Sequence, residues 1–331
     1  MLETGVWLIS AVVIAALVFD FTNGWNDSAN AIATVVSTRV LSPMQAVFLA
    51  AVLNIAGAFT STAVAKTIGG GIVDPHAVTQ VTVLAALLAG IAWNTVMTMI
   101  GMPISASHAL IGGLVGATVA TSGWSPVKFG GLGVVLLAML VSPFLGGLFG
   151  HLVMRLLNAL FGGSSPEFVN RFFRRAQLVS VAFVAFAHGS GDAQKVMGII
   201  TLALFAGHYI PDINVPLWVV AASATAIGLG TAIGGWGVIK TLGMKMLHLK
   251  PIHGFAAETG AAAYLMTAAV VGLPVSSTHT ITGAILGVGT AGQAKRIQWR
   301  VANKILYAWV FTLPASAVAA YCVAAVLKLW L

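Results

Sequence analysis

The sequence has very few charged residues: Asp, Glu, Lys and Arg together make up 7% of its 331 residues, whereas about 25% is usual for a soluble domain. Hydrophobic residues make up 59%, and the mean hydropathy is +0.98. The chain also has a single cysteine, Cys322, which excludes an internal disulfide and a cysteine-based metal cluster. These deficits indicate an integral membrane protein.

Long apolar runs fill most of the chain, and most approach the roughly 20 residues that a membrane-spanning helix needs. Lipid offers no partner for a free backbone N–H or C=O group, so such segments must form closed helices. We therefore expect an all-α polytopic membrane protein, in which the 37 glycines serve close helix packing and broken helices. The runs lie near residues 6–18, 46–65, 78–100, 104–120, 129–160, 178–187 with 196–205, 215–235, 255–272, 275–290 and 305–329.

The net charge of +8 reflects membrane topology and not nucleic-acid binding, because the basic residues gather in alternate loops. By the positive-inside rule these loops are cytoplasmic, so both termini lie outside a cell (inner) membrane. Each half of the chain makes five passes if the short runs 104–120 and 275–290 both cross. Otherwise each short run is a half-helix or part of a re-entrant hairpin. The basic residues concerned are Arg39, Arg155, Arg171, Arg174, Arg175, Lys240, Lys245, Lys250, Lys295, Arg296, Arg300 and Lys304.

Three landmarks occur twice in the same order, on either side of the breaker-rich segment 161–166. An odd number of crossings separates the two copies. Residues 1–165 and 166–331 are therefore predicted to form two inverted repeats within one integrated transmembrane domain, with a shared site near the bilayer midplane. The landmarks are an aspartate motif (Asp27, Asp192), a Lys-Thr-x-Gly motif (Lys66, Lys240) and a Pro-x-Ser-x-Ser/Thr-His motif (Pro103, Pro274), spaced 165, 174 and 171 residues apart.

The aspartate motifs interrupt apolar runs, and an acidic residue at membrane depth marks a polar or ionic pathway by default. We expect the helix to unwind at Gly24, so that freed N–H groups and a new helix N-terminus receive an anion. The alternative is a capped helix start in a polar loop, with Asp27 as the N-cap. The second motif spans residues 188–195 and contains Asp192 and Lys195. The polar neighbours of Asp27 are Asn23, Asn26, Ser28 and Asn30.

The two Pro-x-Ser-x-Ser/Thr-His motifs open the two short apolar runs. Hydroxyl groups together with the unpaired N–H groups of a helix start make a neutral, donor-rich cradle for an oxyanion. Ordinary N-capping and small-residue packing are the structural alternative. His108 and His279 either relay protons or serve as structural donors. The candidate hydroxyl residues are Ser105, Ser107, Ser276, Ser277 and Thr278.

Two further acids have no settled role from the sequence. Glu258 is either a coupling-ion ligand or a helix-end acid that faces solvent, and Asp20 precedes the expected break at Gly24. No set of residues identifies a metal, and no cofactor is expected beyond a coupling ion.

The segments 23–30, 188–198 and 255–262, together with the paired proline motifs, resemble the inorganic phosphate transporter (PiT) family over nearly the whole chain. The resemblance implies a secondary transporter, not an enzyme, that moves inorganic phosphate by alternating access. It also implies an inverted-repeat fold, outward termini and a homodimer. The chain departs from the family at Gly191, where asparagine is common, and at Ala106, where a hydroxyl residue is usual. The implied phosphate-contacting residues are Asn26, Asp27, Ser105, Asp192, Ser276 and Ser277.

The coupling ion is predicted from an asymmetry between the aspartate motifs. In sodium-coupled relatives the second motif ends in asparagine like the first, whereas here Lys195 stands at the position of Asn30, as in the proton-coupled bacterial, low-affinity branch. A lysine ammonium near Asp192 supplies a fixed cation where sodium could otherwise bind. We therefore predict coupling to H+, with Na+ as the alternative. The structural alternative for Lys195 is snorkelling to an interface.

Three rival functions stand beside phosphate transport. Sulfate carries no proton near neutral pH and would face an unpaired carboxylate, whereas protonated phosphate can donate a hydrogen bond to Asp27 or Asp192. Within phosphate transport itself, the substrate is either free phosphate or a metal–phosphate complex. An intramembrane hydrolase would need two carboxylates that share a water molecule, and the chain carries no two-aspartate protease motif. An ion channel would give single-channel currents without saturation.

Overall fold

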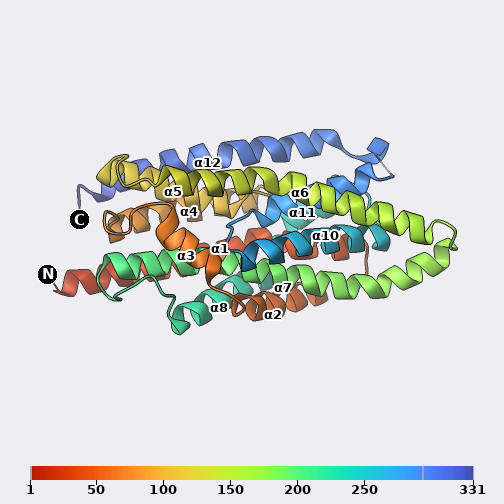
Figure 1. Cartoon of the computed structure of the whole chain (residues 1–331), viewed down its shortest axis with the longest axis horizontal. Helices are drawn as coiled ribbons and strands as arrows, with labels where there is room; N and C mark the ends of the chain where they lie inside the picture. Colours follow the sequence, from red (N-terminus) through yellow and green to blue (C-terminus); the bar gives the residue numbers. More distant parts are fainter. Residues whose placement is uncertain (1, 293, 331) are drawn as a thin grey trace.

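The computed structural model describes residues 2–292 and 294–330, and the side chains from residue 6 onward within those ranges. The chain folds as a bundle of long helices, which confirms the all-α prediction (Figure 1). The first half contains α1 (Leu2–Ser37), α2 (Pro43–Ala58), α3 (Ala63–Gly71), α4 (Gln80–Met99), α5 (Ala106–Ser122) and α6 (Phe129–Phe161). The second half contains α7 (Pro166–Ala206), α8 (Leu217–Ile233), α9 (Trp236–Lys240), η1 (Thr241–Lys245), α10 (Pro251–Val270), α11 (Ser277–Thr290), η2 (Ala294–Arg296) and α12 (Trp299–Leu327).

The same order of elements occurs in both halves. A long helix opens each half and is followed by a sharply bent pair: α2 and α3 meet at 70°, and α8 and the α9–η1 segment meet at 63°. A 20-residue helix (α4, α10) and a short helix capped by a serine (α5, α11) come next. Each half closes with a long helix that contains a proline, Pro143 in α6 and Pro314 in α12.

Several helices are long and apolar enough to cross a membrane. Four qualify singly in the described part of the chain, and the two bent pairs bring the number to six. The short helix α11 has 14 residues and is about 21 Å long, less than the roughly 30 Å of a hydrocarbon core. It cannot span alone, so the half-helix alternative for residues 275–290 fits the structure better than a crossing.

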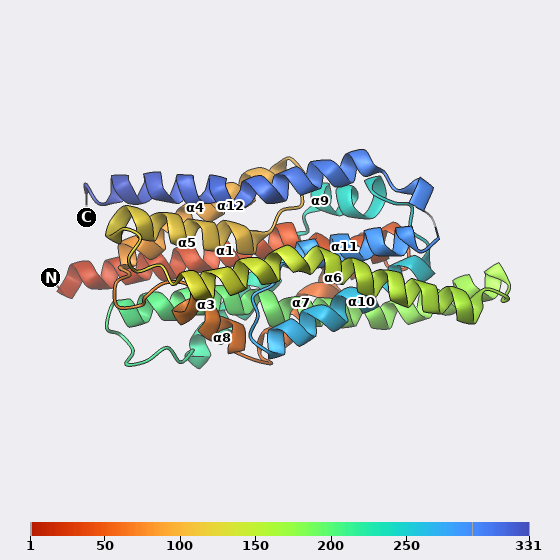
Figure 2. The same ribbon diagram turned by 45° about the horizontal axis from the view of Figure 1, so that its top comes forward.

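All four predicted basic loops gather at one end of the molecule. Arg174 donates a hydrogen bond to the Arg39 carbonyl (2.9 Å), Asn158 donates to the Ala291 carbonyl (3.5 Å), and Gln298 N–H donates to the Met246 carbonyl (3.0 Å). The helix α1 begins and α12 ends at the opposite end, and the α6–α7 hairpin projects beyond the basic end (Figures 1 and 2). This arrangement agrees with the charge pattern that the positive-inside rule uses.

The expected helix breaks at the aspartate motifs are wrong. The helix α1 runs unbroken through Asp27, and α7 runs unbroken through Asp192. Glycine serves close helix packing here: a Cβ at Gly24 would lie 2.3 Å from the Ile227 carbonyl oxygen in α8, and one at Gly189 would lie 2.2 Å from the Asn54 carbonyl oxygen in α2. Asp27 is therefore not an N-cap, and α1 frees no backbone N–H groups of its own beside it.

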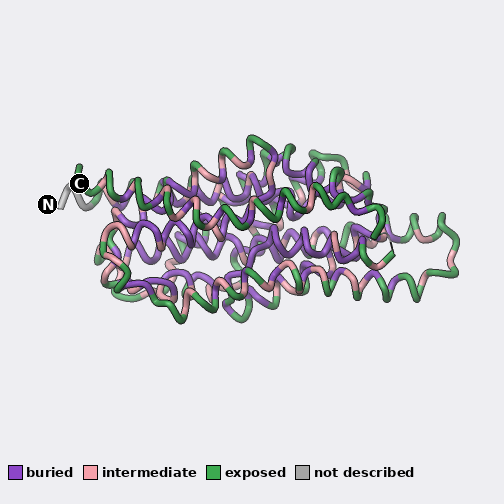
Figure 3. Tube along the Cα trace, turned by 90° about the horizontal axis from the view of Figure 1, so that it is seen from above, coloured by how far each residue is buried: buried purple, intermediate pink, exposed green. Residues whose placement is uncertain are grey.

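Helices of one half pack closely against helices of the other half. The helix α1 packs on α8 and α7 packs on α2, while α5 packs on α12 and α11 packs on α6. Buried backbone lies along the middle of the bundle, and exposed backbone lies on its outer faces and at the projecting hairpin (Figure 3). Because helices of one half are embedded in the other, residues from both halves meet at the centre.

Candidate functional site

Two short helices, α5 and α11, meet head to head inside the bundle. Ser105 caps α5 by accepting the His108 N–H (3.2 Å), and Ser276 caps α11 by accepting the His279 N–H (3.2 Å). The segments before the helices approach each other crosswise: Thr278 Oγ1 lies 2.8 Å from the Ile104 carbonyl oxygen, and Ser107 Oγ lies 3.5 Å from the Val275 carbonyl oxygen. The partial positive charges of two helix N-termini therefore face the centre of the molecule.

Asp27 lies at this meeting point, within hydrogen-bond distance of two hydroxyl groups of α11. Its carboxylate accepts from Thr278 Oγ1 (3.1 Å), and Ser277 Oγ lies 3.3 Å from it. One turn further along α1, Asn30 donates its amide to the same two hydroxyls, at 2.9 Å from Thr278 and 3.3 Å from Ser277. All four side chains are buried. The structure thus brings Asp27, Asn30, Ser277 and Thr278 together.

Asp192 faces Asp27 from α7 and forms an ion pair with Lys195. Ser277 Oγ lies 2.8 Å from Asp192 Oδ2, so this hydroxyl lies between the two carboxylates. Lys195 Nζ also donates to Ser107 Oγ and to the Val275 carbonyl (2.9 Å). Lys195 is 4% exposed, so the snorkelling alternative is wrong and its ammonium is part of the central cluster.

Sequence reasoning did not select His188, which lies between the two carboxylates. Its Nε2 lies 3.2 Å from Asp192 Oδ2 and 3.9 Å from Asp27 Oδ2, and its Nδ1 lies 3.1 Å from Asn54 Oδ1 in α2. The available signal was its position: His188 precedes Asp192 by four residues, and residues four apart share one face of a helix. Asn54 lies in an apolar run, and no motif pointed to it.

The centre is tightly closed. The cavity beside Asp192 and Lys195 has a volume of about 10 Å³, at the lower limit for one water molecule. In the described residues, Asp27, His188 and Asp192 have ligand-type atoms within 4.8 Å of one another, close enough to share a metal ion. Lys195 already provides a cation at Asp192, so we interpret this group as an ion-pair cluster and assign no metal to it.

Asn23 and Asn26 are buried on α1 but lie apart from these contacts. Asn26 donates to Thr98 Oγ1 (2.8 Å) and to the Met102 carbonyl (3.4 Å), at the end of α4. Among the described residues, the amide oxygens of Asn23, Asn26 and Asn30 have no hydrogen-bond partner. The first half therefore keeps three buried acceptor atoms close to Asp27.

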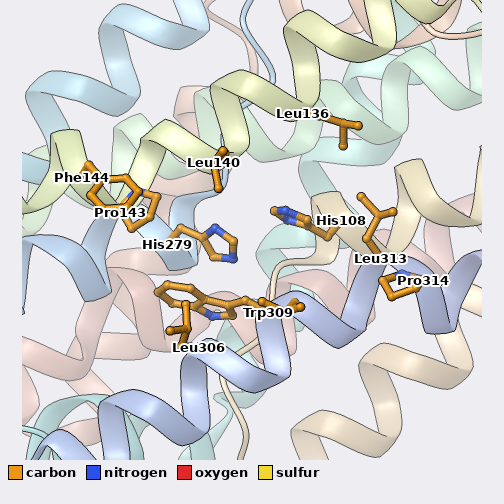
Figure 4. Close-up of a pocket in the computed structure, with 11 residues that line it drawn as sticks. His108, Leu136, Leu140, Pro143, Phe144, His279, Leu306, Trp309, Leu313 and Pro314 are labelled. Atoms are coloured by element: carbon orange, nitrogen blue, oxygen red, sulfur yellow. The ribbon is translucent and has the colours of Figure 1, made fainter.

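His108 and His279 form a separate site. Their rings lie 4.7 Å apart, and His279 stacks on Trp309 of α12 at 3.9 Å (Figure 4). They line a pocket of about 410 Å³ whose other walls are apolar side chains of α6 and α12. Within the described part of the chain, neither ring forms a hydrogen bond or ion pair with Asp27 or Asp192. Their predicted part in proton relay stays a prediction.

Glu258 of α10 is fully buried, so the solvent-facing alternative is wrong. Its carboxylate accepts from Thr34 Oγ1 (2.6 Å), from Gln177 Nε2 (2.7 Å) and from Ser180 Oγ. Thr34 follows Asp27 by seven residues on α1, which is about 10 Å along a helix. Glu258 is thus a satisfied acid in a second polar cluster, towards the end of the molecule that carries the basic loops.

Comparisons with known proteins identify close relatives. A profile of the phosphate transporter family matches residues 23–168 and 161–320. Two relatives named probable low-affinity inorganic phosphate transporter come from Rhizobium meliloti (strain 1021) and Bacillus subtilis (strain 168). The first is 47% identical over 312 residues, which cover 94% of this chain and 93% of the relative. The second is 45% identical over 309 residues, which cover 92% and 93%. A solved structure of a sodium-dependent phosphate transporter superposes with a TM-score of 0.91 at 25% identity, over 98% of this chain and 100% of the other.

Proposed function

The chain belongs to the phosphate transporter family, and we propose on that premise that it moves inorganic phosphate across the membrane by alternating access. It is a multi-pass membrane protein. Its relatives are transporters, which favours transport over the rival of an intramembrane hydrolase. The proposed substrate site is the cluster of Asp27, Asp192, Lys195, Ser277 and Thr278.

The single observation that carries the proposal is the head-to-head meeting of α5 and α11 around two carboxylates and one ammonium. Hydroxyl donors, helix N-termini and a lysine are the groups that bind a phosphate oxyanion. Ser277 and Thr278 donate to the carboxylates in this structure, so phosphate would take over these donors. Protonated phosphate would return a hydrogen bond to a carboxylate, which sulfate cannot do near neutral pH.

Alternating access needs a site that opens to each side in turn. The closed centre supports this, because a cavity of about 10 Å³ admits phosphate only after helices move. The antiparallel courses of α1 and α7, and the exchanged partners of the two halves, support two inverted repeats, residues 1–165 and 166–331 (Figure 1). The basic end is proposed to be cytoplasmic, with both termini outside the cell (inner) membrane.

We propose that protons and not sodium drive transport. The ion pair between Lys195 and Asp192 supports this, since the protein supplies its own cation at the carboxylate where sodium could otherwise bind. Sodium coupling is the second candidate, and one observation favours it: the solved structure with the same fold is a sodium-dependent transporter. The family resemblance also supports a homodimer, which cross-linking in native membranes would test.

Phosphate uptake into proteoliposomes tests the proposal. Purified protein is reconstituted at fixed external phosphate, and uptake is measured with a pH gradient, with a sodium gradient, and with neither. Saturable uptake that a pH gradient drives in sodium-free buffer is expected. Competition by sulfate, and uptake with and without divalent cations, separate phosphate from sulfate and from a metal–phosphate complex. Absence of saturable phosphate uptake under every gradient would refute the proposed function.

A further inference from the structure

The buried centre carries one more negative than positive permanent charge. Asp27 and Asp192 contribute two carboxylates, whereas Lys195 contributes one ammonium, and all three are at most 4% exposed. An uncompensated charge in a low-dielectric interior is very costly. His188 lies between the carboxylates and is the remaining group in this cluster that can become positive.

Hydrogen bonds decide which ring nitrogen of His188 carries its permanent proton. Thr231 Oγ1 of α8 donates to the Ile227 carbonyl (2.9 Å), so it accepts from the amide nitrogen of Asn54 (2.8 Å). The amide oxygen of Asn54 therefore faces His188 Nδ1 at 3.1 Å. An amide oxygen only accepts, so Nδ1 is the nitrogen that carries hydrogen.

This arrangement leaves Nε2 to face the carboxylate oxygens of Asp192 and Asp27. A neutral ring with hydrogen on Nδ1 would point its Nε2 lone pair at negative oxygens, which is repulsive. A proton on Nε2 converts the repulsion into an attraction to both carboxylates and brings the charge of the cluster to zero. Asn54 and Thr231 thus prepare Nε2 to bind and release one proton.

We propose that Nε2 of His188 is the site that carries the transported proton. The inference rests on the proposed proton-coupled phosphate transport and names the group that performs the coupling. In the outward-open state, Nε2 accepts a proton from water and one N–H bond forms. In the inward-open state, that bond breaks and the proton returns to water, while Nδ1–H stays on Asn54 throughout. Phosphate that binds between Lys195 and Ser277 adds negative charge to the cluster and so favours the proton on Nε2, and its departure to the inside removes that charge, which links proton release to substrate release.

The other charged groups around His188 are few. Asp27 of α1 and Asp192 of α7 face its Nε2, and Lys195 pairs with the other carboxylate oxygen of Asp192. Asp20 of α1 is a further buried carboxyl group. The helices α2 and α8 contribute the uncharged Asn54 and Thr231. Glu258 of α10 accepts a hydrogen bond from Ser180, which lies about 12 Å along α7 from His188. Lys66 of α3 is exposed. His279 of α11 lies in the separate ring stack. Asp20 is the rival proton carrier because it is fully buried.

The test compares two transport modes in the same proteoliposomes. Exchange of labelled for unlabelled phosphate at equal pH needs binding and helix movement but no net proton transfer, whereas accumulation against a gradient needs both. We expect His188→Gln to keep exchange, to lose accumulation driven by a pH gradient, and to lose the proton uptake that a pH-sensitive dye records. The half-exposed His151 on α6 provides the matched control, and His151→Gln should keep both modes.

Several outcomes would overturn the inference. One is a His188→Gln variant that still accumulates phosphate with the pH gradient. A second is loss of exchange in a folded variant, which would make His188 a binding residue. A third is the result that Asp20→Asn, and not His188→Gln, keeps phosphate exchange but loses accumulation driven by a pH gradient. Where His188→Gln fails to fold, histidine ¹⁵N spectra of the wild type decide: one buried imidazole protonated on both nitrogens is expected, and its absence overturns the inference. A wild type without proton-driven uptake refutes proton coupling itself, which the variants do not test.

Discussion

The two aspartate centres occupy matching places in α1 and α7, yet their neighbours differ in charge. Around Asp27 the corresponding positions hold the amides Asn23, Asn26 and Asn30. Around Asp192 the same positions hold His188, Gly191 and Lys195. The first centre offers uncharged donors and buried acceptor oxygens, and the second offers a permanent positive charge and a titratable ring.

We propose that this difference divides two tasks between the halves. Amide groups adapt to a ligand because each has both a donor and an acceptor end, whereas a buried ion pair has a fixed charge balance. On the proposed function, the amides of the Asp27 centre are suited to adapt to the substrate, and the Asp192 centre, which also belongs to the substrate site, is suited to couple binding to a proton. Substitutions that make one centre resemble the other test this division.

The largest effect is expected from removal of either carboxylate. Asp27→Asn and Asp192→Asn should each abolish uptake, and Asp192→Asn should also lower the melting temperature more, because it leaves Lys195 unpaired. Breaking a buried ion pair from one side costs about 3–5 kcal/mol. Uptake in proteoliposomes and thermal melting in detergent measure the two effects. Wild-type transport rates in both variants would show that this centre is not the substrate site.

The next largest effect is expected from Lys195→Asn, which gives the second centre the residue that the first has at Asn30. Loss of the ammonium should impair uptake driven by a pH gradient and introduce dependence on sodium, because a free cation can then bind at Asp192. Uptake is compared with and without sodium at fixed pH, with Lys66→Asn as an exposed control. Strong sodium stimulation of the wild type, without response to pH, would contradict the assignment.

A smaller effect is expected at the hydroxyl groups. Ser277→Ala removes a donor that lies between both carboxylates, and a lost hydrogen bond to a charged group costs about 1.5–3 kcal/mol. The phosphate concentration for half-maximal uptake should rise about ten- to a hundredfold. The corresponding residue of the first half is Ala106, so Ala106→Ser tests whether an added hydroxyl lowers that concentration. Unchanged affinity in Ser277→Ala would assign Ser277 to helix packing.

Ser105→Ala provides a comparison with a capping serine. Ser105 accepts the His108 N–H at the start of α5, and loss of such a cap costs about 1 kcal/mol. We expect a lower melting temperature and a smaller rise in the half-maximal phosphate concentration than in Ser277→Ala. An equal or larger rise would place Ser105 in direct contact with phosphate.

The smallest effect is expected at Gly191. A Cβ there would meet nothing within 4 Å, and alanine stabilises a helix interior by about 0.5–1 kcal/mol relative to glycine. Gly191→Ala should keep transport and raise the melting temperature slightly, whereas Gly189→Ala in the same helix should be destabilising because its Cβ meets Asn54. Loss of transport in a stable Gly191→Ala variant would mean that α7 must open at this position.

The sequence by itself determined the class of protein, the repeated landmarks and most residues of the centre. Composition excluded a soluble chain, because so few charges cannot cover a surface in water. Asp27, Asp192, Lys195, Ser277 and Thr278 could be selected because polar groups inside apolar runs are costly in a membrane and mark a polar or ionic pathway. Each of these signals is local, so it can be read from residues that are neighbours in the chain.

Only the tertiary structure decided how those residues meet. It kept α1 and α7 unbroken, because Gly24 and Gly189 serve contacts with helices far away in the sequence. It separated His108 and His279 from the carboxylates, buried Glu258 in its own cluster, and brought Asn54 of α2 against His188 of α7. The physical reason is that a helix gives every residue similar backbone geometry, so a single sequence does not reveal which side of each helix faces which partner. That choice depends on the packing of both halves together.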